Sequence, residues 1–213
     1  TINELVHVIT ETLVHQRGNV IIPAFTVGRT QDLLFLLIDL YRQGKLPVMD
    51  IYVDSPMARA ATEITLKHIA LLDRESSEAL RWMNDTAQKP RIHFVQDIEE
   101  SKQLNHRNGI IIISASGMCD AGRIKQHLKY NLARPGCRIV ITGFQAQGTL
   151  GRRLVDGARQ VRIYGEEIRV RATIHTIGGL SAHADQADLI DWLKHFRAMP
   201  EKIFVMHGEP QNA

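Results

Sequence analysis

The strongest constraint in this sequence is a series of short, almost wholly apolar segments, each followed by a segment with helical periodicity. These segments are rich in Ile and Val and lie at 19–23, 48–53, 109–113 and 137–142. A strand that is apolar along its whole length is buried on both faces, which is typical of a parallel sheet covered by helices. We therefore predict an α/β fold in which a parallel sheet lies between two helical layers.

Between these strands, the apolar periodicity and the capping signals predict helices. Asp54-Ser55-Pro56 offers a capping side chain followed by Pro in the first turn, and Asp97 and Glu100 have the spacing of a capping box. A further strand is expected at 91–96. The helices are expected at 1–16, 30–42, 56–72, about 77–84, from 97 onward, 120–133 and shortly after 149.

From Val161 onward the pattern changes. Segments 161–164 and 168–177 alternate polar and apolar residues, which predicts strands with one polar face. An amphipathic helix is expected at 185–198, and a last strand at 202–206 ends at His207. We place a domain boundary near Gly178, so the predicted domains are 1–178 and 179–213.

Composition limits the class of protein. A chain of 213 residues with 44% hydrophobic content can bury one large domain, or one domain and a fragment of another. No run approaches the roughly 18 apolar residues of a membrane span, and no signal-peptide pattern opens the chain, so we expect a cytoplasmic protein. Cys119 and Cys137 form no Cys-x-x-Cys pair, which argues against a disulfide scaffold and indicates buried thiols.

The net charge of +3 conceals an uneven distribution along the chain. Residues 121–171 contain eleven Lys and Arg against three acidic residues, whereas the rest contains fifteen basic and twenty acidic residues. Such a basic segment is typical of a surface that binds a polyanion. A basic surface that only maintains solubility explains the charge alone equally well.

Ligands of parallel sheets bind at the carboxyl ends of the strands, and in this chain those ends are rich in small residues. The loops concerned are 25–29, 54–56, 114–118 and 143–149. Small residues let backbone N–H groups approach an anion closely. The need for a tight turn explains the small residues in any one of these loops, but it explains their presence in all four loops less well.

The sequence lacks the motifs of several enzyme classes. Gly143 to Thr149 has the glycine spacing of a phosphate-binding loop, but Thr149 stands where the essential Lys is required, which makes a nucleoside triphosphatase improbable. No Gly-x-Gly-x-x-Gly follows the first strand, so a dinucleotide site is weakly supported. No Gly-x-Ser-x-Gly elbow occurs either, which argues against a serine hydrolase.

Two histidines remain as candidates for chemistry. His183 and His207 each follow apolar structure, and Asp185 and Glu209 lie near enough in sequence to orient an imidazole. Imidazoles beside carboxylates suit zinc or manganese hydrolysis. A catalytic zinc normally takes three protein ligands, so further ligands would have to come from elsewhere.

Six motifs occur in order along the chain. They are Ile22 to Gln31, Tyr52 to Ala58, Ser116 to Met118 with Gly122-Arg123, Gly143 to Leu150, Ser181 to Asp185, and Val205 to Glu209. Together they resemble the β-CASP branch of the metallo-β-lactamase superfamily, which includes ribonuclease J and the endonuclease subunit of the cleavage and polyadenylation factor. The resemblance covers nearly the whole chain and is greatest to prokaryotic RNA-processing members.

The resemblance implies a parent protein that is a zinc-dependent ribonuclease with two zinc ions. It implies that His183 contacts the scissile phosphate as general acid, and that His207 ligates zinc. The N-terminal lactamase half, and an acidic partner of His183 just before Thr1, are expected outside this chain. We expect phosphate contacts, from loop position and basic context, at Arg29, Ser114, Ser116, Gly117, Gln147 and Gly148.

The expected partners are RNA, with single-stranded DNA as an open alternative, and the N-terminal lactamase half; a homodimer also stays open. The isolated chain is expected to bind RNA weakly and to lack nuclease activity, because most of the metal site would be missing. A competing interpretation is a non-catalytic nucleic-acid-binding or assembly module in which His183 and His207 are structural. A metallohydrolase of small phosphodiesters or thioesters is a weaker option, disfavoured by the basic segment.

Overall fold

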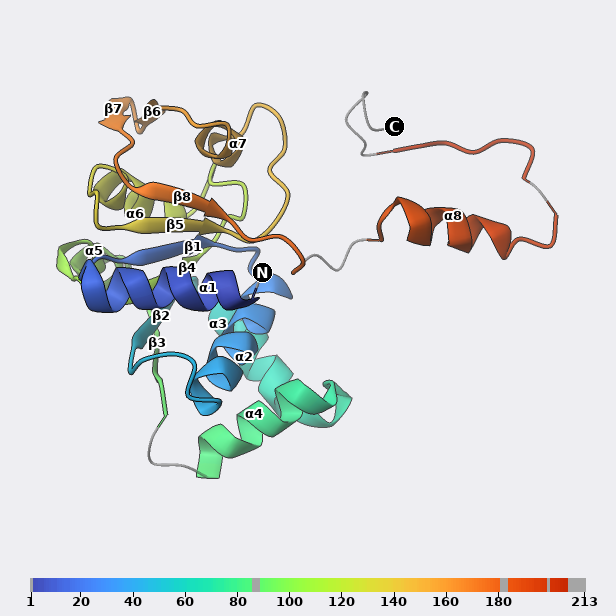
Figure 1. The fold of residues 1–213 in the computed structure, drawn as a ribbon, viewed down its shortest axis with the longest axis horizontal. Helices are drawn as coiled ribbons and strands as arrows, with labels where there is room; N and C mark the ends of the chain where they lie inside the picture. The colour runs from blue at the N-terminus through green and yellow to red at the C-terminus, as the bar shows by residue number, and fades with distance from the viewer. Residues whose placement is uncertain (1, 86–88, 181–183, 199, 207–213) are drawn as a thin grey trace. The chain divides into compact units, whose positions relative to one another are not determined.

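A computed structural model of the chain describes residues 2–85, 89–180, 184–198 and 200–206. These residues belong to two compact units, Thr1–Leu180 and Ser181–Ala213, and each is considered by itself. The first unit is a sheet with helices on both of its faces (Figure 1). Among the described helices, none is long and apolar enough to cross a membrane.

The sheet of the first unit has six strands, and every neighbouring pair is parallel. Their order is β3-β2-β4-β1-β5-β8, so the first strand in the sequence lies near the middle. The predicted parallel α/β sheet is therefore confirmed. The strands are β1 (Val20–Pro23), β2 (Asp50–Asp54), β3 (Arg91–Phe94), β4 (Ile110–Ser114), β5 (Arg138–Ile141) and β8 (Thr173–Thr176).

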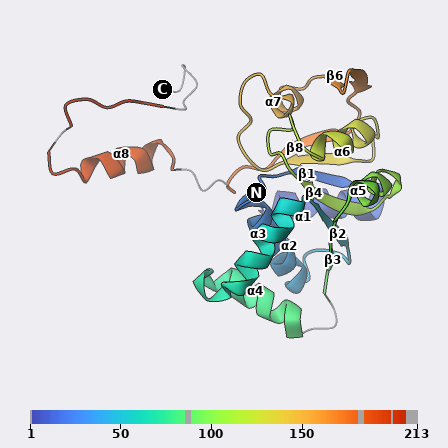
Figure 2. The same ribbon diagram turned by 180° about the vertical axis from the view of Figure 1, so that it is seen from behind.

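The strands divide their side chains between two hydrophobic cores, because successive residues of a strand point to opposite faces. Ile22 and Ile111 belong to one core, and Ile21 and Ile112 to the other. The first core is covered by α1 (Ile2–Thr10), α2 (Arg29–Arg42), α3 (Pro56–Lys67) and α4 (Arg74–Asp85). On the second face, seen from behind in Figure 2, lie α5 (Ile98–Gln103), α6 (Ile124–Asn131) and α7 (Leu150–Val155).

The expected capping residues begin the helices at which they stand. Ser55 accepts a hydrogen bond from the Ala58 N–H (3.2 Å), and Asp97 accepts one from the Glu100 N–H (2.8 Å). Short turns extend three helices: a π-helical turn at Glu11–His15 after α1, and 3-10 turns at Ile69–Leu71 after α3 and Leu104–His106 after α5. These turns account for most of the difference between the expected and observed helix ends.

The expected start of a helix at Asp120 is wrong, because α6 begins only at Ile124. Gly122 has a φ of 78°, a left-handed conformation that a helix cannot contain. Asp120 instead serves another helix: its Oδ1 accepts a hydrogen bond from the Leu150 N–H (2.9 Å), at the start of α7. The polar residue before the apolar stripe therefore caps a helix thirty positions later in the chain.

The expected strand at 168–177 is two strands. β6 (Gln160–Ile163) and β7 (Glu166–Arg169) form a separate antiparallel hairpin, whereas β8 joins the main sheet beside β5. Between them, the N–H groups of Arg171 and Ala172 both donate to the Leu132 carbonyl, at 2.8 and 2.9 Å. This anchorage to the end of α6 redirects the chain from the hairpin to the sheet.

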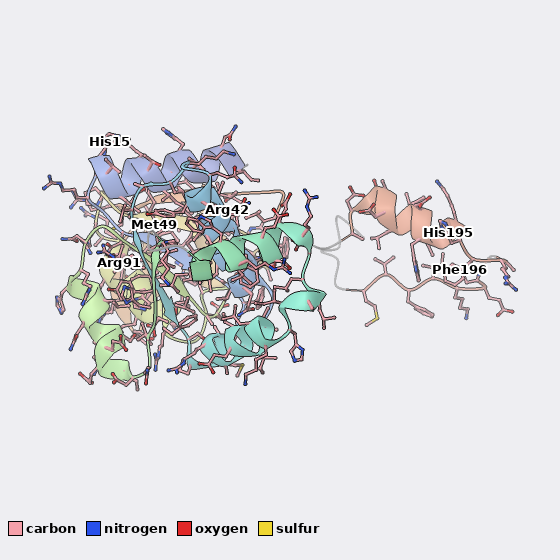
Figure 3. All side chains as sticks on the ribbon, turned by 90° about the horizontal axis from the view of Figure 1, so that it is seen from below. His15, Arg42, Met49, Arg91, His195 and Phe196 are labelled. Atoms are coloured by element: carbon pink, nitrogen blue, oxygen red, sulfur yellow. The ribbon has the colours of Figure 1, made fainter. Side chains whose placement is uncertain are left out.

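The second unit contains α8 (Gln186–Lys194), which Asp185 caps by accepting from the Asp188 N–H at 2.9 Å. The expected strand at 202–206 is wrong for the residues described: they make no strand, and none of 184–198 or 200–206 offers a neighbouring one. An extended segment without a partner leaves its backbone groups to water. Figure 3 labels His195 and Phe196 at the end of α8, where Phe196 meets Trp192 edge-on at 5.0 Å between ring centroids.

A close backbone contact holds the entry of β1 and gives a test of the fold. A Cβ added to Gly18 would lie 1.8 Å from the Gly136 carbonyl oxygen, which is backbone and has no freedom to rotate away. We expect Gly18→Ala to lower the free energy of unfolding by about 2–3 kcal/mol, measured by urea denaturation. Gly143→Ala is the control, since a Cβ there meets nothing within 4 Å; its change should stay below about 1 kcal/mol. Equal effects of both substitutions would contradict this interpretation.

Candidate nucleic-acid interface

Four loops of the first unit leave the sheet on the same side, because parallel strands end at one edge. They follow β1, β2, β4 and β5, and we call residues 24–28, 55, 115–123 and 142–149 the carboxyl edge. In Figure 1 the arrowhead of β8, which runs parallel to these strands, points toward it. This is the edge at which the sequence predicts a ligand, and its loops come from four strands that neighbour one another in the order β2-β4-β1-β5.

The last residue of β2, Asp54, has a fully buried carboxylate with a partner for each oxygen. Its Oδ1 accepts from Arg123 Nη1 at 2.6 Å, and its Oδ2 accepts from Ser101 Oγ at 2.5 Å. Oδ2 also lies 2.6 Å from Nε2 of His127, a histidine that is itself fully buried. One carboxylate thus joins the end of β2 to α5 and to the start of α6.

The environment of Asp54 keeps it ionised. Burial raises the pKa of this carboxyl, but the hydrogen bonds from His127, Ser101 and Arg123 outweigh that effect and hold its pKa below the usual value. The charge of Arg123 is therefore neutralised by Asp54, and its guanidinium also reaches the Gln96 carbonyl (3.4 Å). We assign Arg123 to positioning of the 115–123 loop.

Arg29 is the first residue of α2 and follows Gly28, whose φ of 81° requires glycine. The Arg29 guanidinium lies 3.7 Å from the Asp32 carboxylate, and its side chain is 19% exposed. The preceding loop is closed by Gln31, whose Oε1 accepts from the Gly28 N–H at 2.8 Å. Arg29 thus directly follows the first loop of the carboxyl edge, and its side chain is partly exposed.

Ser114 is a correction to the expected set of phosphate contacts. It ends β4 with only 1% of the residue exposed, and its hydroxyl donates to the Asp54 carbonyl at 2.9 Å. A strand that is apolar on both faces buries its last residue together with the rest, which loop position alone did not indicate. Ser114 therefore links β4 to β2 and is not available to a ligand.

The other expected residues lie at the carboxyl edge itself. Ser116 is part-exposed, and its Oγ accepts from the Ala121 N–H at 3.3 Å. Gly117 is buried, whereas Gln147 and Gly148 are exposed, and Gly148 has a φ of 81°. These residues come from the loops after β4 and β5, so the structure brings two of the predicted loops to one edge.

A residue that the sequence did not single out, Gln145, joins these two loops. Its Nε2 donates to the carbonyls of Gly117 (3.0 Å), Phe144 (3.1 Å) and Gly143 (3.3 Å). Only 6% of the residue is exposed. The pairing crosses 28 positions of sequence, so only the fold reveals it.

Most residues of the expected catalytic centre lie outside the described part of the chain. They are His183, His207 and Glu209, whereas Asp185 is described and uses its carboxylate to cap α8. Within the described part of the chain, no group of three or more His, Cys, Asp or Glu residues could hold a metal ion. The described residues by themselves therefore do not fit a zinc site.

The Asp54 group and Gln145 are the functional features that sequence reasoning missed. A partial signal existed, because Gly122-Arg123 and Tyr52 to Ala58 both belong to the six motifs. The sequence did not show that Arg123 pairs with Asp54, since Ser101 and His127 lie in no motif and complete the group only in three dimensions.

Comparison with protein families gives two matches. A model of the Beta-Casp domain matches residues 30–154. A model described as the Zn-dependent metallo-hydrolase RNA specificity domain matches residues 167–213. The first match alone covers more than half of the chain and includes the carboxyl-edge loops after β2, β4 and β5.

Curated relatives are similar along almost the whole chain. "Ribonuclease TTHA0252" of Thermus thermophilus is 35% identical over 99% of this chain and 48% of its own length. "Transcription termination factor FttA" of Pyrococcus abyssi is 35% identical over 97% of the chain and 33% of its own length. "RNase J-like protein" of Methanocaldococcus jannaschii is 32% identical, over 97% and 46% respectively. The chain therefore spans less than half the length of these relatives.

The buried Asp54 carboxylate predicts a pH-dependent loss of stability. Asp54→Asn removes the negative charge beside Arg123 and replaces one of the two acceptor oxygens by an amide NH2 group, which cannot accept a hydrogen bond. The free energy of unfolding at pH 7 should therefore fall by about 3–5 kcal/mol. Because the pKa of Asp54 is lowered by folding, its contribution is full above the unfolded pKa of about 3.9 and is lost as pH falls through the folded pKa. The gap between the two proteins should therefore be constant from pH 7 to 5 and shrink at lower pH.

Urea denaturation of both proteins over this pH range makes the measurement. Asp50→Asn is the matched control, since Asp50 begins the same strand and pairs with Arg91, a contact in which the two side chains are 25% and 62% exposed. Its loss should stay below about 1 kcal/mol. A gap for Asp54→Asn that persists unchanged at pH 3 would rule out an ionised carboxylate as the cause.

Proposed function

Because the chain belongs to the β-CASP family of the metallo-β-lactamase superfamily, we propose that it is the RNA-clamping part of a zinc-dependent ribonuclease. The reaction is hydrolysis of an RNA phosphodiester bond by water. When bound, zinc would supply activation of that water, as metal ions do in other hydrolases. The similarity to a ribonuclease over 99% of the chain supports this assignment of substrate.

The observation that carries the proposal is the convergence of four loops at the carboxyl edge. Ser116, Gln147 and Gly148 lie there with part-exposed or exposed backbone and side chains, beside Arg29 at the start of α2. Backbone N–H groups in glycine-rich turns bind phosphate without a formal charge of their own. We assign the phosphate contacts to these four residues and to the Gly117 backbone. Ser114 is excluded because its buried hydroxyl already donates to the Asp54 carbonyl.

We assign the chemistry to the second unit. His183 is the general acid that donates a proton to the leaving oxygen, and His207 is one zinc ligand of a site that holds two ions. We assign Asp185 and Glu209 to the orientation of these imidazoles. We assign the remaining ligands to an N-terminal lactamase half. The relatives are long enough to contain such a half, because the chain spans 48% of the ribonuclease and 33% of the termination factor.

The two proposed roles, RNA binding and catalysis, belong to two successive segments of the chain. We propose that residues 1–178 form the β-CASP domain and that residues 179–213 complete the lactamase domain. This division is supported by the first compact unit, which ends at Leu180.

Nuclease activity of the full-length protein tests the assignment of chemistry. We expect RNA cleavage that a chelator abolishes, and a rate lowered about 10²- to 10⁴-fold by His183→Ala, because a general acid contributes that much. Zinc content measured in the same samples should be unchanged by this substitution. Chelator-resistant cleavage, or full activity of His183→Ala, would overturn the proposed roles.

RNA affinity tests the carboxyl edge separately from catalysis. Arg29→Ala should weaken binding of single-stranded RNA about tenfold at low salt, since it removes one charge-assisted contact. The slope of log affinity against log salt should fall by about 0.7, the value for one phosphate on a single strand. Fluorescence anisotropy over a salt series measures both quantities.

Arg91→Ala provides the matched control for this charge. Arg91 also pairs with a carboxylate, that of Asp50 at 2.7 Å, but it begins β3 at the opposite end of the sheet. Figure 3 labels it near Met49, whose carbonyl accepts from the Arg91 N–H. An equal loss of affinity from both substitutions would mean that net charge, and not the carboxyl edge, determines RNA binding.

A second function is favoured by one specific observation. Relatives that are 35% identical over 97% of the chain bear the name transcription termination factor. The chain would then act as a nucleic-acid-binding module of a larger assembly, without chemistry of its own. Metal analysis of the full-length protein separates the two: about two zinc ions per chain support the nuclease, and none supports the module.

A further inference from the structure

Two aromatic side chains project from adjacent loops of the carboxyl edge and have no role in the function proposed so far. Phe25 follows β1 and is 54% exposed; Phe144 follows β5 and is 60% exposed. β1 and β5 are hydrogen-bonded neighbours in the sheet, so these loops emerge side by side. Both rings therefore stand at the place where we assign the phosphate contacts.

The backbone of Phe25 is held by hydrogen bonds, and its exposed ring packs against Gly117. Its carbonyl accepts from the N–H and from the hydroxyl of Thr30, at 3.2 and 2.7 Å. The ring lies against Gly117, where an added Cβ would be 3.0 Å from two of the ring carbons. One side of the ring is thus covered by backbone, and more than half of the residue still faces solvent.

The position of Phe144 depends on the same contact. The buried amide of Gln145 donates to the carbonyl of Phe144 and to that of Gly117, on which Phe25 rests. A single side chain therefore ties the backbone of Phe144 to that of Gly117, the residue against which the Phe25 ring lies. An aromatic side chain has only two rotatable angles, so it binds a flat partner with little loss of conformational entropy.

A nucleobase is the flat partner that this environment favours. Exposed aromatic rings beside phosphate-binding groups are the usual means of holding single-stranded nucleic acid, because every base has a face on which a ring can stack. In a duplex those faces are covered by neighbouring bases. Val27 and Met57 are also exposed here, by 69% and 67%, but an aliphatic side chain cannot stack on a base in this way.

We propose that Phe25 and Phe144 form a stacking platform for unpaired bases, which makes the carboxyl edge selective for single-stranded RNA. This inference rests on the proposed RNA-binding function and adds what that function leaves open, namely how single strands are distinguished from duplexes. The phosphates lie on the residues assigned above, and the bases lie on the two rings. Besides offering its backbone to a phosphate, Gly117 supports the ring of Phe25.

The test measures the affinity of the full-length protein for two single strands with the same phosphates. One is oligouridylate, and the other is an abasic strand of equal length; His183→Ala in every variant prevents cleavage. Phe25→Ala and Phe144→Ala should each weaken binding of oligouridylate between about 5-fold and 150-fold and leave the abasic strand unchanged. Phe144→Trp should restore affinity, whereas Phe144→Leu should not.

Val27→Ala is the matched control, because Val27 lies on the same loop as Phe25 and is more exposed. It should change neither affinity. Equal losses on both strands, or no loss on either, would overturn the platform. So would a lowered unfolding temperature in the Phe variants with unchanged RNA affinity, since the rings would then pack on another part of the protein. If the unsubstituted protein binds neither strand, the proposed function itself fails.

Discussion

Burying an ionised carboxylate costs several kcal/mol unless hydrogen bonds and an opposite charge offset the loss of water. At Asp54 the compensation comes from two helices: Ser101 lies on α5, and His127 lies on α6 with Arg123 just before it. The end of β2 and two helices are thereby fixed to one another. This group also fixes the position of the loop 115–123, which contains Ser116 and Gly117 of the interface.

Much of the fold could be predicted because the strands are buried on both faces and are therefore apolar along almost their whole length. Ile110 to Ile113 has no polar position, and the observed strand differs from the expected one by a single residue at either end. The failures share a physical cause, namely partners distant in sequence. Asp120 caps α7, the chain after β7 is held by Leu132, and the segment 202–206 has no neighbouring strand among the described residues.

The candidate site could be predicted as a place but not as a set of contacts. The carboxyl ends of parallel strands meet by geometry, so the ends of the predicted strands alone placed the loops of Arg29, Ser116 and Gly148 at one edge. Whether a side chain in such a loop faces solvent depends on the neighbouring strand, which is why Ser114 was misassigned. The tie made by Gln145 and the exposure of Phe144 likewise depend on packing that no local pattern records.

The position of β1 in the sheet has a consequence for how the chain acquires its structure. Val20 aligns with Ile111 on one side and with Arg138 on the other, so the partners of this strand follow about 90 residues or more later. β1 leaves the ribosome before its partner strands. Until those partners have been synthesised, its backbone is unpaired and both of its apolar faces are exposed. Protection of this nascent strand, by its own α1 and α2 or by a chaperone, is therefore a condition for productive synthesis.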